Sequence, residues 1–248
     1  MNVIYILWLR QLKRYFRSKS RLIGALGQPL LFLFALGFGF GPIFQKAGEG
    51  DYMQFLVPGI IAMSVLFTSM FNGIEIIWDR QFGFLKETLV APVSRVKIML
   101  GRTLGGATVA IFQGIIILAI SFLIGFRLFN PVLLPLALLF MFLIATLFTA
   151  LGTAIASVLE DIHGFQLIMN FLVMPLFFLS GALFPLQDLP VALEIIMRFN
   201  PLSYGVDGLR GSLIGAHQLG IATDLGILSA CSFILVIIGG YLFSKIQL

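Results

Sequence analysis

Six apolar runs of about 20 residues each dominate this chain and leave it few ways to fold. They cover residues 22–44, 55–78, 103–126, 132–158, 165–184 and 225–243. A helix of this length crosses the hydrocarbon core of a bilayer and satisfies its own backbone hydrogen bonds, which lipid cannot do. Charged residues make up only 11% of the chain, too few to cover a water-facing surface. We therefore predict an all-α membrane protein with six transmembrane helices in a single domain, residues 1–248.

The Lys and Arg residues lie mostly on one side of these predicted spans. An even number of spans puts both termini on one side, which then carries twelve Lys and Arg against four on the other. Positive residues are retained in the cytoplasm, so both termini and the basic loop 79–102 are expected there. The same distribution accounts for the net charge of +5 without a nucleic-acid partner.

The N-terminal segment, residues 1–21, has the pattern of a basic amphipathic helix at the membrane surface. One face carries Tyr5, Trp8, Leu9, Leu12 and Phe16, and another carries Arg10, Lys13, Arg14 and Arg17. Two roles stay open. The helix either anchors the topology, or acts as a lever packed beside the loop 79–102.

The segment between the fifth and sixth runs, residues 185–215, does not resemble a simple loop. The fifth run stops at Phe184-Pro185, and Asn200-Pro201 combines a good helix N-cap with a residue suited to the first helical turn. Two short helices are expected, the second containing Tyr204, and both are too short to cross a bilayer. We predict an outer re-entrant element, either a cap that seals the bundle or part of an exit path.

The sequence offers no catalytic, metal or cofactor site. Gly101–Gly106 lacks the Lys of a phosphate-binding loop and fits a helix-packing contact better. His163 and His217 fall in loops on opposite sides. The acid within a predicted span is Glu75, near its cytoplasmic end, and it suits either pairing with Arg80 at the interface or a role in coupling. We expect no enzymatic activity from this chain.

Three stretches carry a resemblance to a known family. They are RLIGALGQPLLFLFALGFGFG at residues 21–41, FLKETLVAPVSRVKIMLGRTLGG at 84–106 and SGALFPLQDLPVALEIIMRFNPLSYGVDGLRG at 180–211. The chain resembles the membrane subunit of type-2 ABC exporters, nearest the drug-exporter and nodulation-factor-exporter branch.

That resemblance implies a homodimer with two ATP-binding cassette subunits, which would hold the ATP and Mg. It implies that residues 82–90 form a coupling helix seated on the ATPase. The residues expected at or near this contact are Phe84, Leu85, Lys86, Glu87, Thr88, Ser94 and Arg95. It also implies a prokaryotic inner-membrane location.

The function expected is ATP-driven export of an amphipathic, lipid-like or drug-like substrate. Export of a lipid-linked glycan is an alternative. A passive channel or ion-coupled transporter is another, although it should show ionisable residues at mid-membrane or an internal repeat, and the sequence displays neither.

Overall fold

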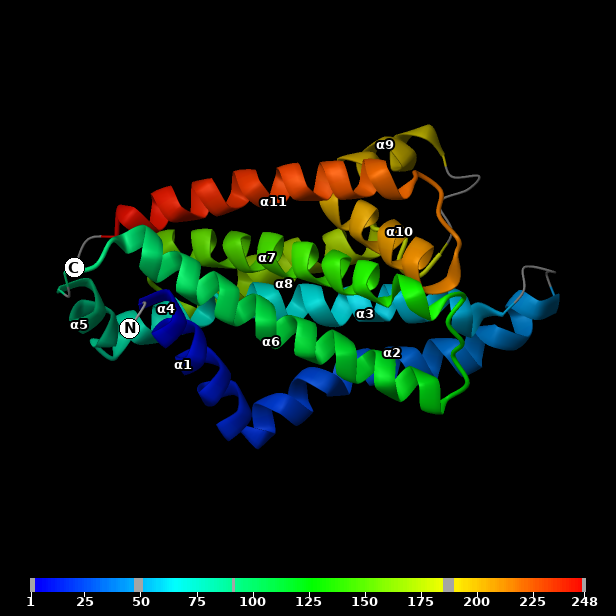
Figure 1. Cartoon of the computed structure of the whole chain (residues 1–248), viewed down its shortest axis with the longest axis horizontal. Coiled ribbons are helices and arrows are strands. Elements are labelled where there is room, and N and C mark those ends of the chain that lie inside the picture. The colour runs from blue at the N-terminus through cyan, green and yellow to red at the C-terminus, as the bar shows by residue number, and fades with distance from the viewer. Residues whose placement is uncertain (1–2, 47–50, 91, 185–189, 247–248) are drawn as a thin grey trace.

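The structure, a computed structural model, describes residues 3–46, 51–90, 92–184 and 190–246. Every regular element within these ranges is helical, which confirms the all-α prediction. Most of the helices run side by side along one long axis, and α1 begins at the end of the bundle where α11 finishes (Figure 1). The elements are α1 (Val3–Arg17), α2 (Lys19–Lys46), α3 (Tyr52–Phe71), α4 (Ile74–Gln81), α5 (Phe84–Val90), α6 (Arg95–Leu123), η1 (Pro131–Leu133), α7 (Leu134–Val158), α8 (Ile162–Phe178), α9 (Val191–Phe199), α10 (Pro201–Ile214) and α11 (Ile221–Ser244).

Five helical segments of the described chain are long and apolar enough to cross a membrane. They are Lys19–Phe44, Tyr52–Gln81, Arg95–Leu123, Pro131–Val158 and Ile221–Ser244. They correspond to the first, second, third, fourth and sixth predicted spans. The third starts at Arg95 rather than at 103, so the last eight residues of the predicted loop 79–102 are helical. The chain is therefore a multi-pass membrane protein.

The fifth predicted span is the exception. Its helix, α8, has 17 residues, about 25 Å at 1.5 Å per residue, against a core of about 30 Å. It begins at Ile162 and ends at Phe178, so the predicted end at Phe184 is wrong. The chain turns after Phe178, and Gly181 takes a left-handed φ of 73°. A sixth crossing stays a prediction.

The second span is broken into α3 and α4 at Asn72-Gly73. A side chain on Gly73 would collide with the backbone of α7, since its Cβ would lie 2.4 Å from Gly152 O. A Cβ on Gly152 would in turn lie 2.4 Å from Met70 O. The Asn72 amide donates to Gly106 O of α6 at 3.2 Å. Small residues thus let three backbones meet at the break, as is common where membrane helices pack.

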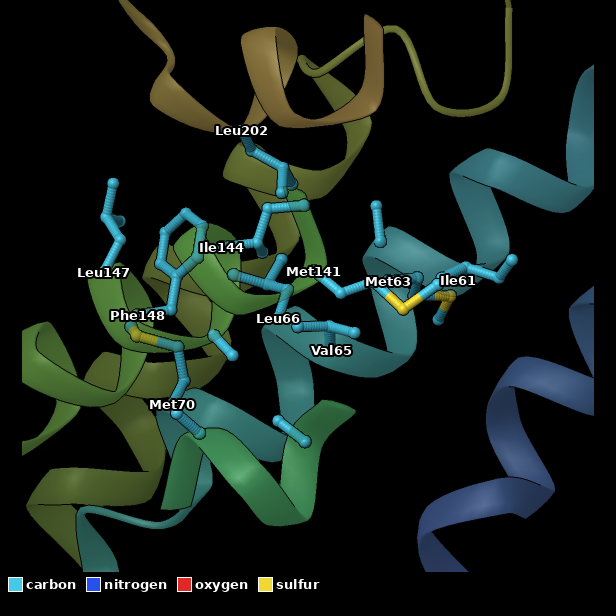
Figure 2. Close-up of a cluster of buried hydrophobic side chains, with 14 of the residues drawn as sticks. Ile61, Met63, Val65, Leu66, Met70, Met141, Ile144, Leu147, Phe148 and Leu202 are labelled. Atoms are coloured by element: carbon cyan, nitrogen blue, oxygen red, sulfur yellow. The ribbon is translucent and has the colours of Figure 1, made fainter. Parts of the chain in front are cut away.

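The core of the bundle forms around α3, which is buried along most of its length. Figure 2 shows Ile61, Val65 and Leu66 of α3 beside Met141 and Ile144 of α7, with Leu202 of α10 above them. This packing holds α3, α7 and α10 together. The α4–α5 segment lies at the end of the bundle where α1 begins (Figure 1).

Candidate functional site

Two acids on α4 lie at the centre of a charged cluster that we call the arginine network. Glu75 and Asp79 occupy successive turns of α4 and are only 3% and 5% exposed. The network consists of these two acids with Arg10, Arg14, Arg21 and Arg102. Buried carboxylates need partners, and those partners come from three other helices.

The arginines of the network join three other helices to α4. Arg10 of α1 donates to both oxygens of Asp79, at 3.2 and 3.3 Å. Arg14, one turn further along α1, lies 3.6 Å from an oxygen of each acid. Arg21 of α2 bonds Glu75, and Arg102 of α6 bonds Asp79, both at 2.5 Å. The network therefore fastens α1, α2 and α6 to α4.

The expected pairing of Glu75 with Arg80 is wrong. Arg80 instead donates to two carbonyl groups at the end of α7, Leu159 O at 3.2 Å and Ser157 O at 3.1 Å. Its guanidinium also lies 3.7 Å from the exposed carboxylate of Glu160. Arg80 thus ties α4 to the α7–α8 connection.

The helix α5 lies directly after α4 and presents apolar side chains outward. It is shorter than predicted, because Phe82 ends α4 and Gly83, at φ 76°, turns the chain before Phe84. Phe82 is 83% exposed and Val90 78% exposed, beside the exposed Lys86 and Glu87. Only Leu85 of this helix is buried. This helix thus combines exposed apolar and charged side chains.

Of the other residues predicted for this contact, Thr88 and Arg95 bond within the chain, whereas Ser94 is exposed. Thr88 donates to Phe84 O, one turn back in α5. Ser94 is the N-cap of α6, without a side-chain capping bond. Arg95 donates to Ser244 O at 2.6 Å and Ile246 O at 2.9 Å, and so holds the end of α11. The structure therefore gives Arg95 an internal role.

The helix α1 packs against α6 and reaches α5. A Cβ on Gly101 or Gly105 would lie within 3.0 Å of atoms of α1, so these glycines form the predicted packing contact. Arg10 Cζ lies 3.9 Å from the centroid of the Phe84 ring. These contacts place α1 beside α5, where the lever role requires it, and the anchor role stays open as well. The face of α1 that packs inward carries Leu7, Gln11 and Tyr15, whereas Tyr5 and Phe16 of the predicted apolar face are half-exposed.

The predicted outer element contains the two expected helices. Asn200 caps α10 by accepting from Leu202 N, and Pro201 occupies the first helical position. The Asn200 amide donates to Leu176 O at 2.7 Å and Leu179 O at 3.0 Å, at the end of α8. Arg210 of α10 donates to Gly181 O and Ala182 O. The Asn200 amide thus satisfies carbonyl groups that the end of α8 leaves free, and Arg210 satisfies two carbonyl groups of the turn that follows.

The remaining predicted residues of this element are arranged around those caps. Tyr204 donates to Arg198 O at 2.8 Å and so ties α10 to α9. Phe184 is partly exposed in the turn after α8. Pro185 falls outside the residues that the structure describes. The helix α10 is buried from Leu202 to Leu213.

Comparison with known proteins gives this architecture a family. The family model described as ABC-2 type transporter matches residues 2–214, most of the chain. The chain belongs to the ABC-2 type transporter family.

Named relatives of this ABC-2 chain cover nearly its whole length. It is 27% identical to Nodulation protein J of Rhizobium leguminosarum bv. trifolii over 94% of this chain and 86% of that protein. It is 28% identical to the inner membrane transport permease YadH of Escherichia coli K12, over 90% and 87%. It is 31% identical to the putative transport permease ycf38 of Cyanophora paradoxa, over 84% and 72%. The resemblance stated from the sequence motifs is confirmed.

Sequence reasoning missed a second set of buried charges in this ABC-2 permease. Asp207 of α10 accepts from Gln218 N and Leu219 N, and Arg210 lies over the Phe55 ring. Asp224, in the first turn of α11, is fully buried. Its carboxylate receives no hydrogen-bond donor from the described residues, and its neighbour is the Asp207 carboxyl. The available signal was Asp224, an acid directly before the apolar run 225–243. Its position at the end of a predicted span made it resemble an ordinary boundary residue.

Proposed function

We propose that this permease is the membrane subunit of an exporter driven by a separate ATP-binding subunit. The observation that carries the proposal is α5, a short helix with apolar side chains exposed outside the bundle. Its neighbour α4 is anchored through buried charges to α1, α2 and α6. A protein docked on α5 could therefore displace several helices at once, and this is what an energy-transducing contact requires.

The proposed assembly is a homodimer with two ATP-binding cassette subunits, which would bind the ATP and Mg. The chain itself would hold no ATPase site. One relative is named an inner membrane transport permease, and we place this chain in a prokaryotic inner membrane too. The distribution of Lys and Arg supports cytoplasmic termini and a cytoplasmic α5.

The proposed cargo is an amphipathic, lipid-like or drug-like molecule leaving the cytoplasm or the inner leaflet. The partly exposed helices α2 and α8 support this, because they offer Phe34, Phe38 and Phe171 rather than charges. Nucleotide binding shifts such a transporter only if it favours one conformation over the other. Closure of two ATPase subunits against two copies of α5 would supply that preference. The segment α9–α10 would be an outer re-entrant element.

The test is to reverse a charge on α5. Glu87→Arg should abolish the stimulation of the partner ATPase and lower its co-purification, without changing the thermal stability of the permease. Glu194→Arg is the control, because Glu194 is also exposed but lies on α9. Unchanged stimulation in Glu87→Arg, or equal losses in both variants, would sink the assignment.

An ion-coupled transporter is a second candidate because of Asp224. A buried carboxylate without a donor is what such a mechanism uses, and it lies beside Asp207. Transport by reconstituted permease without any ATPase, driven by a proton gradient and abolished in Asp224→Asn, would support this candidate. Transport that depends on the ATPase would reject it.

A further inference from the structure

A cavity of about 400 Å³ lies between the first turns of α2 and the α3–α4 break. Its apolar wall includes Phe67 and Phe71 of α3 and Trp78 of α4. Its polar residues include Tyr15 of α1, Arg21 of α2 and Glu75 of α4. One side of the cavity thus suits a hydrocarbon chain, and the other reaches the arginine network.

The arginine network has more positive than negative charge. Four arginines share two carboxylates, which leaves two positive charges uncompensated within the network. Arg102 is almost fully buried, yet its Nε and one terminal nitrogen have no acceptor within the described chain. Burying unmatched charge is costly, and an anion beside the network would lower that cost.

Arg21 is the member of the network that can meet such an anion. It lines the cavity, and its side chain is one-third exposed although it also bonds Glu75. A guanidinium has five donors, so Arg21 can hold Glu75 and a second anion together. Burial raises the pKa of the Tyr15 hydroxyl, which therefore remains neutral and does not repel an anion.

The surroundings of the cavity favour a lipid over a soluble anion. Figure 1 shows α1 and α2 meeting in a V, and the cavity lies along the α2 arm. Ile23 and Leu31 of that arm are largely exposed apolar residues. Lys13, Arg17 and Lys19 around the bend make no ion pair with any described residue, so they add positive potential that attracts anionic lipid.

We propose that this cavity binds an anionic phospholipid-like amphiphile, with its phosphate on Arg21 and an acyl chain against Phe67, Phe71 and Trp78. The inference deepens and rests on the proposed function, because it names the substrate class that the exporter would load. The phosphate would balance part of the network's positive charge. The acyl chain of the lipid would enter the cavity from the membrane leaflet on the α5 side.

The experiment uses the full chain in lipid nanodiscs and the fluorescence of Trp78. The chain has two tryptophans, and Trp8→Phe leaves Trp78 as the sole reporter. Brominated phosphatidylglycerol should quench Trp78 about five-fold more effectively than brominated phosphatidylcholine, as one arginine–anion contact predicts. Equal quenching by the two lipids would overturn the proposal.

Three variants separate a site from general attraction. Arg21→Gln should abolish the preference, and so should Arg21→Gln/Glu75→Gln, which restores the network's charge. Lys19→Gln is the matched control. It also removes one positive charge and lies two residues from Arg21, but Lys19 does not line this cavity. A loss in Lys19→Gln as large as in Arg21→Gln would reject a specific site.

A space-filling variant protects the test against misfolding of the charge variants. A Cβ on Gly24, which lines the cavity, would meet nothing within 4 Å. Gly24→Leu should therefore fold, keep every charge and reduce quenching by both lipids, and unchanged quenching would overturn the proposal. Inorganic phosphate should not displace the lipid, and displacement would contradict a lipid ligand. If the unmodified site shows no lipid preference while the permease still stimulates the ATPase, only the lipid site is rejected. The proposed function is decided separately, by the Glu87→Arg test.

Discussion

Arg102 of α6 lies 2.5 Å from Asp79 of α4, and the two side chains are only 3% and 6% exposed. The pair joins the start of a membrane-spanning helix to the helix that precedes α5. Asp79 is the ion-pair partner of Arg102, so Arg102 cannot lose it without leaving a charge unmatched in a poorly solvated site, whereas Asp79 also pairs with Arg10 and Arg14.

Asp79→Asn should destabilise the protein by about 3–5 kcal/mol, because it leaves Arg102 buried without its carboxylate. Detergent-solubilised protein followed by thermal or denaturant unfolding measures this. Glu160→Gln is the control, since its side chain is 87% exposed and 3.7 Å from Arg80, and it should cost about 0–1 kcal/mol. Similar losses in the two variants would contradict the importance assigned to the buried pair.

Gly152→Ala should destabilise the bundle, because the new Cβ would lie 2.4 Å from the backbone oxygen of Met70. Neither backbone can yield cheaply, and overpacking of this kind costs about 1–3 kcal/mol. Gly27→Ala is the matched control. It is also a glycine inside a helix, its Cβ would meet nothing within 4 Å, and alanine is the better helix former. The unfolding midpoint of Gly27→Ala should stay level or rise.

Asn200→Ala should loosen the junction of α8 and α10. The variant loses the N-cap of α10 and two bonds to the end of α8, worth about 1–3 kcal/mol together. Hydrogen exchange should accelerate at residues 176–180 and 202–204 before the rest of the bundle. Asn130→Ala removes an exposed cap of η1 and should leave these amides protected. Unchanged protection in Asn200→Ala would refute the capping role.

Two neighbouring aspartates should respond in opposite directions to the same substitution. Asp224→Asn replaces a buried carboxyl that receives no donor from the described residues and faces the Asp207 carboxyl, and it should raise the unfolding midpoint. Asp207→Asn removes a carboxylate that accepts from two backbone N–H groups and should lower it, by about 1–3 kcal/mol. A fall in stability for Asp224→Asn would show that the Asp224 carboxyl makes a stabilising contact.

Arg10 and Phe84 should be energetically coupled. A double-mutant cycle with Arg10→Gln and Phe84→Leu, measured by unfolding, should give a coupling of about 0.5–1 kcal/mol for a partly exposed cation–π contact. If α1 acts as a lever rather than an anchor, each single variant should also weaken ATPase stimulation. Tyr5→Leu, on the outer face of the same helix, serves as the control. Strict additivity in the cycle would show that the Arg10–Phe84 contact contributes no interaction energy.

The sequence predicted features that depend on neighbours in the chain. Five apolar runs became long helices, and Asn200-Pro201 started α10, because length, hydropathy and capping are local properties. The predicted end at Phe184 was wrong because the chain turns after Phe178, where its carbonyl groups accept from Asn200 and Arg210, more than 20 residues further along. Ser180-Gly181 is a local turn signal within residues 165–184, but the bonds from Asn200 and Arg210 could not be inferred from those residues alone.

The candidate site shows the same division. Exposed apolar residues on a short helix after Gly83 follow from the local sequence, and the structure has them. The partners of Glu75 could not be read this way, since Arg14 and Arg21 lie more than 50 residues earlier. Arg80 was nearer in sequence but faces α7. The network forms only in the folded chain. Sequence spacing alone could not show which of the arginines pair with Glu75.

The hydrogen bonds from Arg95 to the end of α11 make the last helix a suitable place to detect movement of α5. Arg95 is the first residue of α6, close after α5, and it bonds Ser244 O and Ile246 O. Movement of α5 and the start of α6 would therefore displace the end of α11. The chain contains one cysteine, Cys231, and it lies partly exposed in α11. A spin label or fluorophore placed there needs no prior removal of other thiols. The native sequence therefore already carries a single attachment point from which conformational change can be followed spectroscopically.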